Sequence, residues 1–398
     1  MRQLYLAATG QNRGKTTASL GLFDGFVGRG VRTGFMKPVG QRTVIEDGVP
    51  ADEDAVLVRA IFGLPELLTA MSPVHIPRGF TKSYIAGEVV EDLPARIRVA
   101  HATFADRDLL LIEGTGHAGV GAVVGLSNAV VAAMLGAPAI IVSGGGVGRP
   151  IDEIVLNASH FAAHGVAVAG AIVNKVDVDA QPGIAAVLER GLALHGIPLL
   201  GILPYRPILS NPTLAMIVEG LAGELLCPGP DLDLVIGAVS IGAMEPGHVL
   251  ERLRPRTLVI VSGDREDVIL TLTTSHRMGH PRGGTAAGIG GVDRGIGNGG
   301  ASRATPGAAP ADAPSTAGLV LTGGYRPRRP VVDAIRRAGL FALLVPDETY
   351  AVASAVHDLL VKTHAADAGK IALIKALVAE HLDVDRILDV ATEARLGA

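Results

Sequence analysis

The sequence predicts an α/β fold with a mostly parallel sheet flanked by helices, followed by a smaller α/β domain. Across residues 1–222, short β-branched runs alternate with longer amphipathic runs, which is typical of strands connected by helices. The expected strands are apolar on both faces, as they are when helices cover both sides of a parallel sheet. Hydrophobic residues make up 48% of the 398 residues and aromatic residues only 3%, so Ala, Val, Leu and Ile must build the cores.

The expected elements of residues 1–222 follow from hydrophobic periodicity. Strands are expected at residues 3–8, 33–36, 108–112, 139–143, 168–173 and 198–202. Helices are expected at about residues 15–27, 53–62, 91–103, 127–135, 152–164 and 182–195.

The composition changes after residue 222. Residues 223–232 are rich in proline and acidic residues, so we expect a linker there. The α/β alternation resumes over residues 233–365, which we expect to form the second domain. Within it, residues 279–316 are rich in Gly, Ala and Pro with few large apolar residues, and this composition predicts a disordered insert. Residues 366–398 have the spacing of a C-terminal helical pair.

Composition also limits the partners and the compartment. A formal net charge of −4 argues against a non-specific nucleic-acid binder. The single cysteine, Cys227, excludes an intramolecular disulfide and fits a reducing cytoplasm. We expect no signal peptide, because the first residues enter a strand directly. The long apolar stretch 129–142 contains Gly136 and Pro138, so it is better divided into a helix and a strand than interpreted as a membrane span.

The loop after the first strand indicates a nucleotide site. Residues 9–17, TGQNRGKTT, join an apolar strand to a helix start, where backbone amides can hold an anion. In such a P-loop, Lys15 would reach the terminal phosphates of ATP or GTP and the Thr16 hydroxyl would contact Mg²⁺. Thr9 stands where the usual spacing has its first glycine, so an ordinary strand–turn–helix is the alternative interpretation. The expected nucleotide-binding residues of this loop are Gly10, Gln11, Asn12, Arg13, Gly14, Lys15, Thr16 and Thr17.

Three further charged positions follow expected strands or begin a helix. Glu113 ends a buried strand, where a carboxylate can serve the metal or simply cap the strand. Asp54 belongs to the acidic run 52–54, which helix capping explains by itself. Lys37 follows a strand and either holds a phosphate or an anionic substrate, or is an exposed lysine.

Residues 174–177, Asn-Lys-Val-Asp, also follow an expected strand. The pattern NKxD at this location is typical of a site that recognises a nucleotide base. The side chains of Asn174 and Asp177 would contact the base edge, and the stem of Lys175 would pack on its ring. Taken literally, the pattern suits guanine.

Residues 1–222 resemble the dethiobiotin synthetase-type P-loop NTPase family, above all its version at the N-terminus of long phosphate acetyltransferases, the phosphotransacetylase family. The matching segments are TGQNRGKTT at 9–17, KPVGQR at 37–42, Asp54-Ala55, EGTGHAGVG at 113–121, the Gly-rich turn at 144–148 and LPYRPILSNPTL at 203–214. Residues 233–365 resemble the DRTGG domain that follows this module. Its markers here are Ser262-Gly263-Asp264-Arg265, Leu321-Thr322-Gly323-Gly324 and Pro346-Asp347-Glu348-Thr349-Tyr350.

The resemblance implies a role for each candidate residue. Thr16, Asp54 and Glu113 would share the Mg²⁺. Lys15 and Lys37 would hold the phosphates, which makes these lysines and Glu113 the candidate catalytic residues. Asn174 would face adenine, so the choice between ATP and GTP stays open. Relatives of this kind commonly dimerise, so the resemblance implies a homo-oligomer.

Two functions are compatible with these residues. One is a regulatory or sensor module that binds ATP and Mg²⁺ in the first domain and a second small ligand in the DRTGG-like domain. It would report to a separate enzyme of acetyl-CoA or acetyl phosphate metabolism. The DRTGG-like part takes most residues after 222, so we expect no acyltransferase activity from this chain. The alternative is an ATP-dependent ligase of the dethiobiotin synthetase type, which activates a carboxylate or carbamate by phosphoryl transfer.

Overall fold

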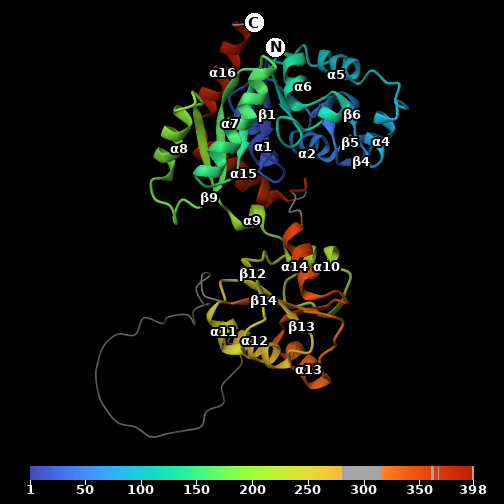
Figure 1. Ribbon diagram of the computed structural model, residues 1–398, viewed down its shortest axis with the longest axis vertical. Helices are drawn as coiled ribbons and strands as arrows, with labels where there is room; N and C mark the ends of the chain where they lie inside the picture. Colours follow the sequence, from blue (N-terminus) through green and yellow to red (C-terminus); the bar gives the residue numbers. More distant parts are fainter. Residues whose placement is uncertain (280–314, 360–362, 366, 397–398) are drawn as a thin grey trace. The chain divides into compact units, whose positions relative to one another are not determined.

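The structure is a computed structural model that describes residues 1–279, 315–359, 363–365 and 367–396 (Figure 1). The chain forms two compact units, Met1–Arg206 with Lys362–Ala398, and Pro207–Val361. Both are α/β, as predicted from the sequence. The first unit ends before the boundary expected at residue 222, and the expected insert 279–316 lies almost wholly outside the described residues.

The first unit is built on a parallel six-stranded sheet in the order β10-β9-β8-β1-β7-β2. Its central strands are fully buried over most of their length, so the predicted apolar character on both faces is confirmed. The strands are β1 (Arg2–Ala8), β2 (Thr33–Met36), β7 (Leu109–Glu113), β8 (Ala139–Ser143), β9 (Val168–Val176) and β10 (Leu199–Pro204).

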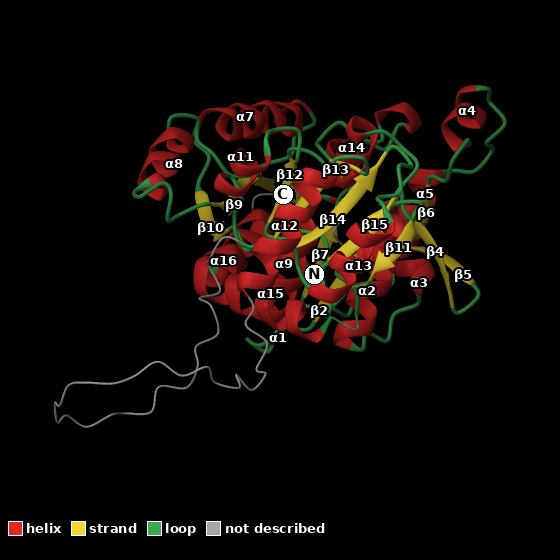
Figure 2. Ribbon diagram, turned by 90° about the horizontal axis from the view of Figure 1, so that it is seen from below, coloured by secondary structure: helices red, strands yellow, loops and turns green. Residues whose placement is uncertain are grey.

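Helices cover both faces of this sheet. Figure 2 shows α7 and α8 on one side of β9 and β10, with α1, α15 and α16 on the other. The main helices are α1 (Lys15–Val27), α2 (Glu53–Phe62), α5 (Leu93–Ala102), α6 (Asn128–Leu135), α7 (Gly148–Ala163), α8 (Ile184–Ala193), α15 (Ala368–His381) and α16 (Val384–Leu396). Local signals set several ends: Ser127 accepts a hydrogen bond from the Val130 amide at the start of α6, and Gly136 ends it with φ 65°.

Between β2 and α5 and after β7, the first unit carries short elements that the sequence analysis did not expect. Each spans two to six residues, too few for hydrophobic periodicity to reveal. They are β3 (Val39–Gly40), β4 (Thr43–Glu46), β5 (Val49–Asp52), α3 (Leu68–Met71), β6 (Val74–His75), α4 (Phe80–Ile85) and the 3₁₀ helix η1 (Ala122–Val124).

The second unit has a five-stranded sheet in the order β11-β15-β14-β13-β12, with β11 antiparallel at one edge. Its strands are β11 (Glu224–Cys227), β12 (Ala238–Ile241), β13 (Thr257–Ser262), β14 (Thr316–Thr322) and β15 (Phe341–Leu344). Its helices are α9 (Pro207–Ser210), α10 (Leu214–Gly220), α11 (Pro246–Glu251), α12 (Glu266–Gly279), α13 (Arg329–Ala338) and α14 (Thr349–Asp358).

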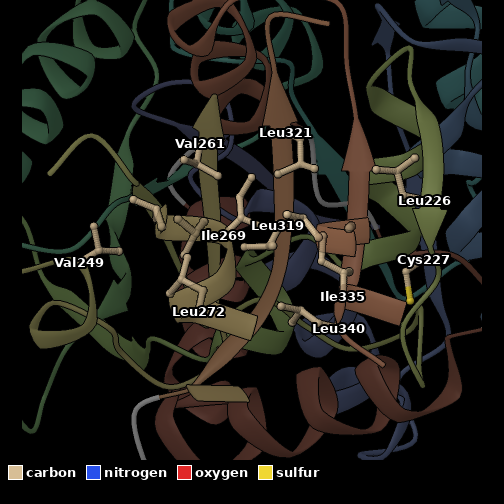
Figure 3. Close-up of a cluster of buried hydrophobic side chains, with 14 of the residues drawn as sticks. Leu226, Cys227, Val249, Val261, Ile269, Leu272, Leu319, Leu321, Ile335 and Leu340 are labelled. Carbon is tan, nitrogen blue, oxygen red and sulfur yellow. The ribbon is translucent and has the colours of Figure 1, made fainter. Parts of the chain in front are cut away.

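Each face of the second sheet has its own hydrophobic core. On one face, Val261 and Leu321 of the strands pack with Ile269 and Ile335 of the helices (Figure 3). The other face packs against α10 and α14. The expected linker 223–232 contains β11, because Leu226 and Cys227 are buried in the first of these cores and Pro228 only follows the strand. In the described part of the chain, no helix has both the length and the apolar composition that a membrane span requires.

Candidate nucleotide site

The loop between β1 and α1 has a backbone that only a few residues allow. Asn12 and Gly14 have φ values of 57° and 90°, in the left-handed region. A Cβ at Gly14 would lie 1.8 Å from Nδ2 of Asn174, so this position requires glycine. The first-turn amides of α1 have no intrahelical acceptor, and the loop places them at the positive end of the helix dipole. This geometry fits an anion.

Lys15 begins α1 and lies near Glu113 and Asp54, whose charges act on it without forming an ion pair. Burial, followed by the positive charge of Lys37, lowers the pKa of its ammonium to about 8. Among the residues that the structure describes, no carboxylate lies within ion-pair distance of this ammonium, whereas Lys37 has two. A partly exposed cation without a paired carboxylate fits an incoming phosphate.

The structure brings four predicted residues into one cluster. The Thr16 hydroxyl donates to Oδ1 of Asp54 at 3.1 Å. The Lys37 ammonium lies 2.5 Å from Oδ2 of Asp54 and 2.7 Å from Oε1 of Glu113. Lys37 and Glu113 are almost fully buried, and the Asp54 side chain is 21% exposed. The alternative of an exposed Lys37 is therefore wrong, because its ammonium lies between two carboxylates.

The charges in this cluster perturb one another. Burial opposes the charge of Lys37, but Asp54 and Glu113 outweigh it and raise the pKa of that lysine well above its usual value. Burial also raises the pKa of Glu113, to about 7, although Lys37 acts to lower it. Asp54 keeps a low pKa despite burial, because Lys37 and the Thr16 hydroxyl stabilise its charged form.

The acidic run 52–54 divides between two roles. Asp52 caps α2, since its Oδ1 accepts from the Asp54 amide, and its Oδ2 accepts from the amides of Gln41 and Arg42. Asp54, two residues later, turns into the cluster with Lys37. Capping therefore explains Asp52 but does not explain Asp54.

The NKxD residues at the end of β9 lie in different surroundings. Asn174 is buried against the loop, and its Nδ2 donates to the carbonyl of Arg13 at 3.0 Å. Asp177 is exposed, and its Oδ1 accepts from the Ala180 amide at 3.0 Å. The structure thus places Asn174 beside the loop and shows Asp177 stabilising its own turn.

Two contacting residues were not predicted. Glu153 of α7 accepts from Arg13 at 3.2 Å and from the Thr9 hydroxyl at 2.9 Å, so it fastens the loop to the neighbouring helix. Ser19 donates its hydroxyl to Glu113. Ser19 lies one helical turn after Thr16, a spacing that could have revealed it. Glu153 lies in the middle of an amphipathic helix, where no local pattern distinguishes it.

The segment after β7 is held by a buried amide. Asn128 donates to the carbonyls of Thr115 and His117 at 2.7 Å each, and its Oδ1 accepts from the Thr115 amide and the Tyr5 hydroxyl. Gly121 has a φ of 96°, and a Cβ there would lie 2.2 Å from the carbonyl oxygen of Leu126. The path of residues 113–121 beside the cluster is therefore fixed.

In the second unit, the polar residues of the DRTGG-like motif bond to the unit itself. Arg265 pairs with Asp267 and donates to the carbonyl of Met244 at 3.1 Å. The Gly323 amide donates to the carbonyl of Asp347, and the hydroxyls of Thr322 and Thr349 lie 2.7 Å apart. These contacts join the loops at the carboxyl ends of neighbouring strands.

The donor set of the first unit fits Mg²⁺. Two carboxylates, Asp54 and Glu113, and the Thr16 hydroxyl present oxygen ligands, which Mg²⁺ prefers. The described residues contain no group of three or more His, Cys, Asp or Glu side chains placed to hold a metal alone. That is the usual situation of Mg²⁺, which takes one or two carboxylates and completes its shell with phosphates and water.

Comparison with known families gives two matches. The model of an "AAA domain" matches residues 2–213, and that of a "DRTGG domain" matches residues 216–359. Phosphate acetyltransferase of Synechocystis sp. is 27% identical over 283 residues, 69% of this chain and 39% of that protein. The enzyme of Pseudomonas putida is also 27% identical, over 96% of this chain and 51% of that protein. The chain therefore spans about half or less of the length of these relatives.

Two solved structures are similar to parts of the chain. The septum site-determining protein MinD of Pyrococcus horikoshii, complexed with Mg-ADP, is 15% identical, with a TM-score of 0.34 over 52% of this chain and 83% of that one. The CBS and DRTGG domains of Clostridium perfringens pyrophosphatase, complexed with diadenosine tetraphosphate, are 13% identical. Their TM-score is 0.26 over 42% of this chain and 60% of that one.

Proposed function

The chain belongs to the AAA-domain family of P-loop proteins and carries a DRTGG domain after it, and from this membership we propose that it is an ATP- and Mg²⁺-binding regulatory module. One observation carries the proposal: contacts from Thr16 to Asp54, from Asp54 to Lys37 and from Lys37 to Glu113 link these four residues beside the loop that precedes Lys15. Their sequence positions are far apart, so a shared site is the simplest reason for this assembly.

In this proposal the loop amides and Lys15 hold the phosphates. Within the described residues, no carboxylate forms an ion pair with Lys15, and a phosphate would supply a directly bonded anion. Thr16, Asp54 and Glu113 would hold the Mg²⁺, which neutralises phosphate charge when bound. Lys37 would exchange part of its contact with the carboxylates for contact with the nucleotide.

We favour ATP over GTP. One N–H of the Asn174 amide is donated to the carbonyl of Arg13, which orients the side chain, and its Oδ1 can accept from the base. Adenine presents an exocyclic amine to such an acceptor, whereas guanine presents a carbonyl oxygen at the corresponding position. The exposed Asp177, engaged with Ala180, gives no support to guanine.

We assign a sensing role to the second unit. Tyr325 and Tyr350 are 59% and 78% exposed, and they follow β14 and β15, whose carboxyl ends lie at the same edge of the sheet. Ligands of parallel sheets bind at that edge. The proposed module takes a small molecule there, assembles as a homo-oligomer, and reports to a separate enzyme of acetyl-CoA or acetyl phosphate metabolism.

A ligase of the dethiobiotin synthetase type is the second candidate function. The observation in its favour is that Lys37 is a buried cation whose charge acts on Lys15, and two cations can neutralise charge as a phosphoryl group moves. This candidate gives no role to the second unit, so we rank it below the regulatory module.

Calorimetry and phosphate release test the proposal. The full chain and its Lys15→Ala variant are titrated with ATP and with GTP in the presence of Mg²⁺, and Lys82→Ala, at an exposed lysine of α4, is the control. The module predicts tight ATP binding, weaker GTP binding and slow hydrolysis, with binding lost only in Lys15→Ala. Rapid hydrolysis without a second substrate would favour an enzyme, and absence of nucleotide binding would contradict both functions.

A further inference from the structure

The last two helices of the chain pack on the helix that begins the P-loop site. Residues 360–398 lie outside both matched family models, yet α15 and α16 belong to the first unit. The chain reaches them only after the second unit, so that unit is an insertion between β10 and α15. Figures 1 and 2 show α15 beside α1, the helix that begins at Lys15.

The contact between α15 and α1 is close. A Cβ at Gly21 of α1 would lie 2.2 Å from Cγ2 of Val378 in α15, so the two helices approach at a distance that only glycine permits. Four residues later, a Cβ at Gly25 would lie 3.2 Å from Val384 at the start of α16. The face of α1 that meets α15 and α16 therefore carries glycines at its contact points, where a larger side chain would clash with Val378 or crowd Val384.

One side chain of α15 contacts both α1 and α2. The Lys375 ammonium lies 2.8 Å from Oδ1 of Asp24 in α1. The same ammonium stands 4.9 Å from the centre of the Phe62 ring in α2, within cation–π distance. The Phe62 ring packs in turn on Phe23 of α1, with ring centres 4.5 Å apart. Lys375 thus links α1 and α2 by contacting one residue of each helix.

The other ends of these two helices carry the candidate metal ligands. Thr16 and Asp54 are the second residues of α1 and α2, and they are joined by a hydrogen bond of 3.1 Å. Eight residues separate Thr16 from Asp24, and eight separate Asp54 from Phe62, which is about 12 Å along each helix. An α-helix is stiff over two turns. A contact that holds the C-terminal parts of α1 and α2 together therefore also sets the relative orientation of their N-terminal ends, where Thr16 and Asp54 lie.

We infer that α15, through Lys375, positions the metal ligands of the nucleotide site. Lys375 is a positioning residue: it holds α1 and α2 together so that Thr16 and Asp54 stay aligned. The inference rests on the proposed binding of ATP with Mg²⁺.

The expected effect is selective. Lys375→Ala removes an ion pair whose side chains are 33% and 39% exposed together with one cation–π contact, so the fold is retained. An exposed ion pair and a cation–π contact together correspond to about a three- to tenfold change in an equilibrium constant. The loss falls on Mg²⁺-dependent affinity, because the loop amides and Lys15 hold phosphate without using Asp54.

A control lies at the end of α1. Arg29, two residues after α1 ends, pairs with Asp385 of α16 at 2.6 and 2.9 Å, and the two side chains are 38% and 73% exposed. This pair joins the C-terminal helices to the far end of α1 and does not touch Phe62. Asp385→Ala should therefore remove a comparable surface contact without altering the metal ligands.

The test is the affinity of the full chain for a non-hydrolysable ATP analogue, measured by calorimetry with Mg²⁺ and with EDTA. In Lys375→Ala, the gain in affinity from Mg²⁺ should fall about three- to tenfold, while the affinity in EDTA stays unchanged. Lys375→Arg should restore the gain, and Asp385→Ala should keep it. A normal Mg²⁺ gain in Lys375→Ala, or an equal loss in Asp385→Ala, overturns this inference alone. Absence of nucleotide binding in the unmodified chain overturns the proposed function as well.

Discussion

Replacing Lys37 by methionine should convert the cluster into a site that binds a divalent cation without nucleotide. In the structure the Lys37 ammonium contacts the same carboxylates, Asp54 and Glu113, that the metal would use. A free metal ion must therefore compete with a cation that is covalently attached to the fold. Methionine has a similar length and no charge, so it removes the competitor and leaves the carboxylates in place.

The magnitude follows from the burial of the pair. Removing one partner of a buried ion pair costs about 3–5 kcal/mol of folding free energy. Asp54 is 21% exposed and Glu113 can protonate, since burial already raises its pKa to about 7. We therefore expect the lower value, about 3 kcal/mol, at or below pH 7, where Glu113 can take up a proton. A divalent ion whose concentration is about a hundred times its dissociation constant would restore about 2.7 kcal/mol of folding free energy.

Manganese binding followed by electron paramagnetic resonance, together with urea unfolding followed by circular dichroism, measures both effects. We predict that Lys37→Met is destabilised in EDTA, binds Mn²⁺ without nucleotide, and regains most of its stability with Mg²⁺. The unmodified chain and Lys82→Met should bind free Mn²⁺ weakly. Equal stability of Lys37→Met and the unmodified chain in EDTA, or equally tight binding of free Mn²⁺ by the unmodified chain, would show that Lys37 does not compete with the metal.

Three further predictions concern the loop and its support. Gly14→Ala should abolish ATP binding in calorimetry, because its Cβ would lie 1.8 Å from Asn174 and its φ is 90°; unchanged affinity would contradict the loop geometry. ATP affinity should fall up to about tenfold per pH unit above pH 8, since burial lowers the pKa of Lys15 to about 8 and only the protonated ammonium attracts phosphate; a flat profile from pH 7 to 10 would argue against this. Asp52→Ala should lower unfolding free energy by about 1–2 kcal/mol in urea titrations through loss of the α2 cap, and equal stability would exclude the cap.

The parallel sheet was predictable because its signal is local and repeated. Each main strand is a buried apolar run followed by an amphipathic helix, and the observed strands β1, β2 and β8 begin and end within one residue of their expected bounds. The short elements between β2 and α5 were not predictable, because two to six residues cannot establish a period. The strand β11 was hidden by the proline that follows it in a composition typical of a linker.

The candidate site was predictable where its residues belong to a local sequence motif, and not where only the tertiary fold brings residues together. Lys15 and Thr16 stand in a motif whose local shape already suggests anion binding. Asp54 could not be separated from Asp52 by sequence, because either carboxylate can cap α2 and only the tertiary fold turns one of them towards Lys37. Glu153 contacts the loop from a distant helix, so no local pattern reveals it.

The role of the C-terminal helices also depends on the tertiary fold. Their periodicity predicts two helices but not the surface on which they pack. Gly21 and Gly25 have helical spacing in α1, yet only the structure shows that Val378 and Val384 lie over them. A segment at the end of the chain thus completes the unit with which the chain begins.

The most direct test of the proposed site is the affinity of the full chain for ATP in calorimetry, with Mg²⁺ and with EDTA, compared with that of Asp54→Asn. We predict that Mg²⁺ tightens ATP binding in the unmodified chain and that Asp54→Asn loses this gain while it still binds ATP in EDTA. An affinity that does not depend on Mg²⁺, or a full Mg²⁺ gain in Asp54→Asn, would contradict the assignment of this cluster as the metal and nucleotide site.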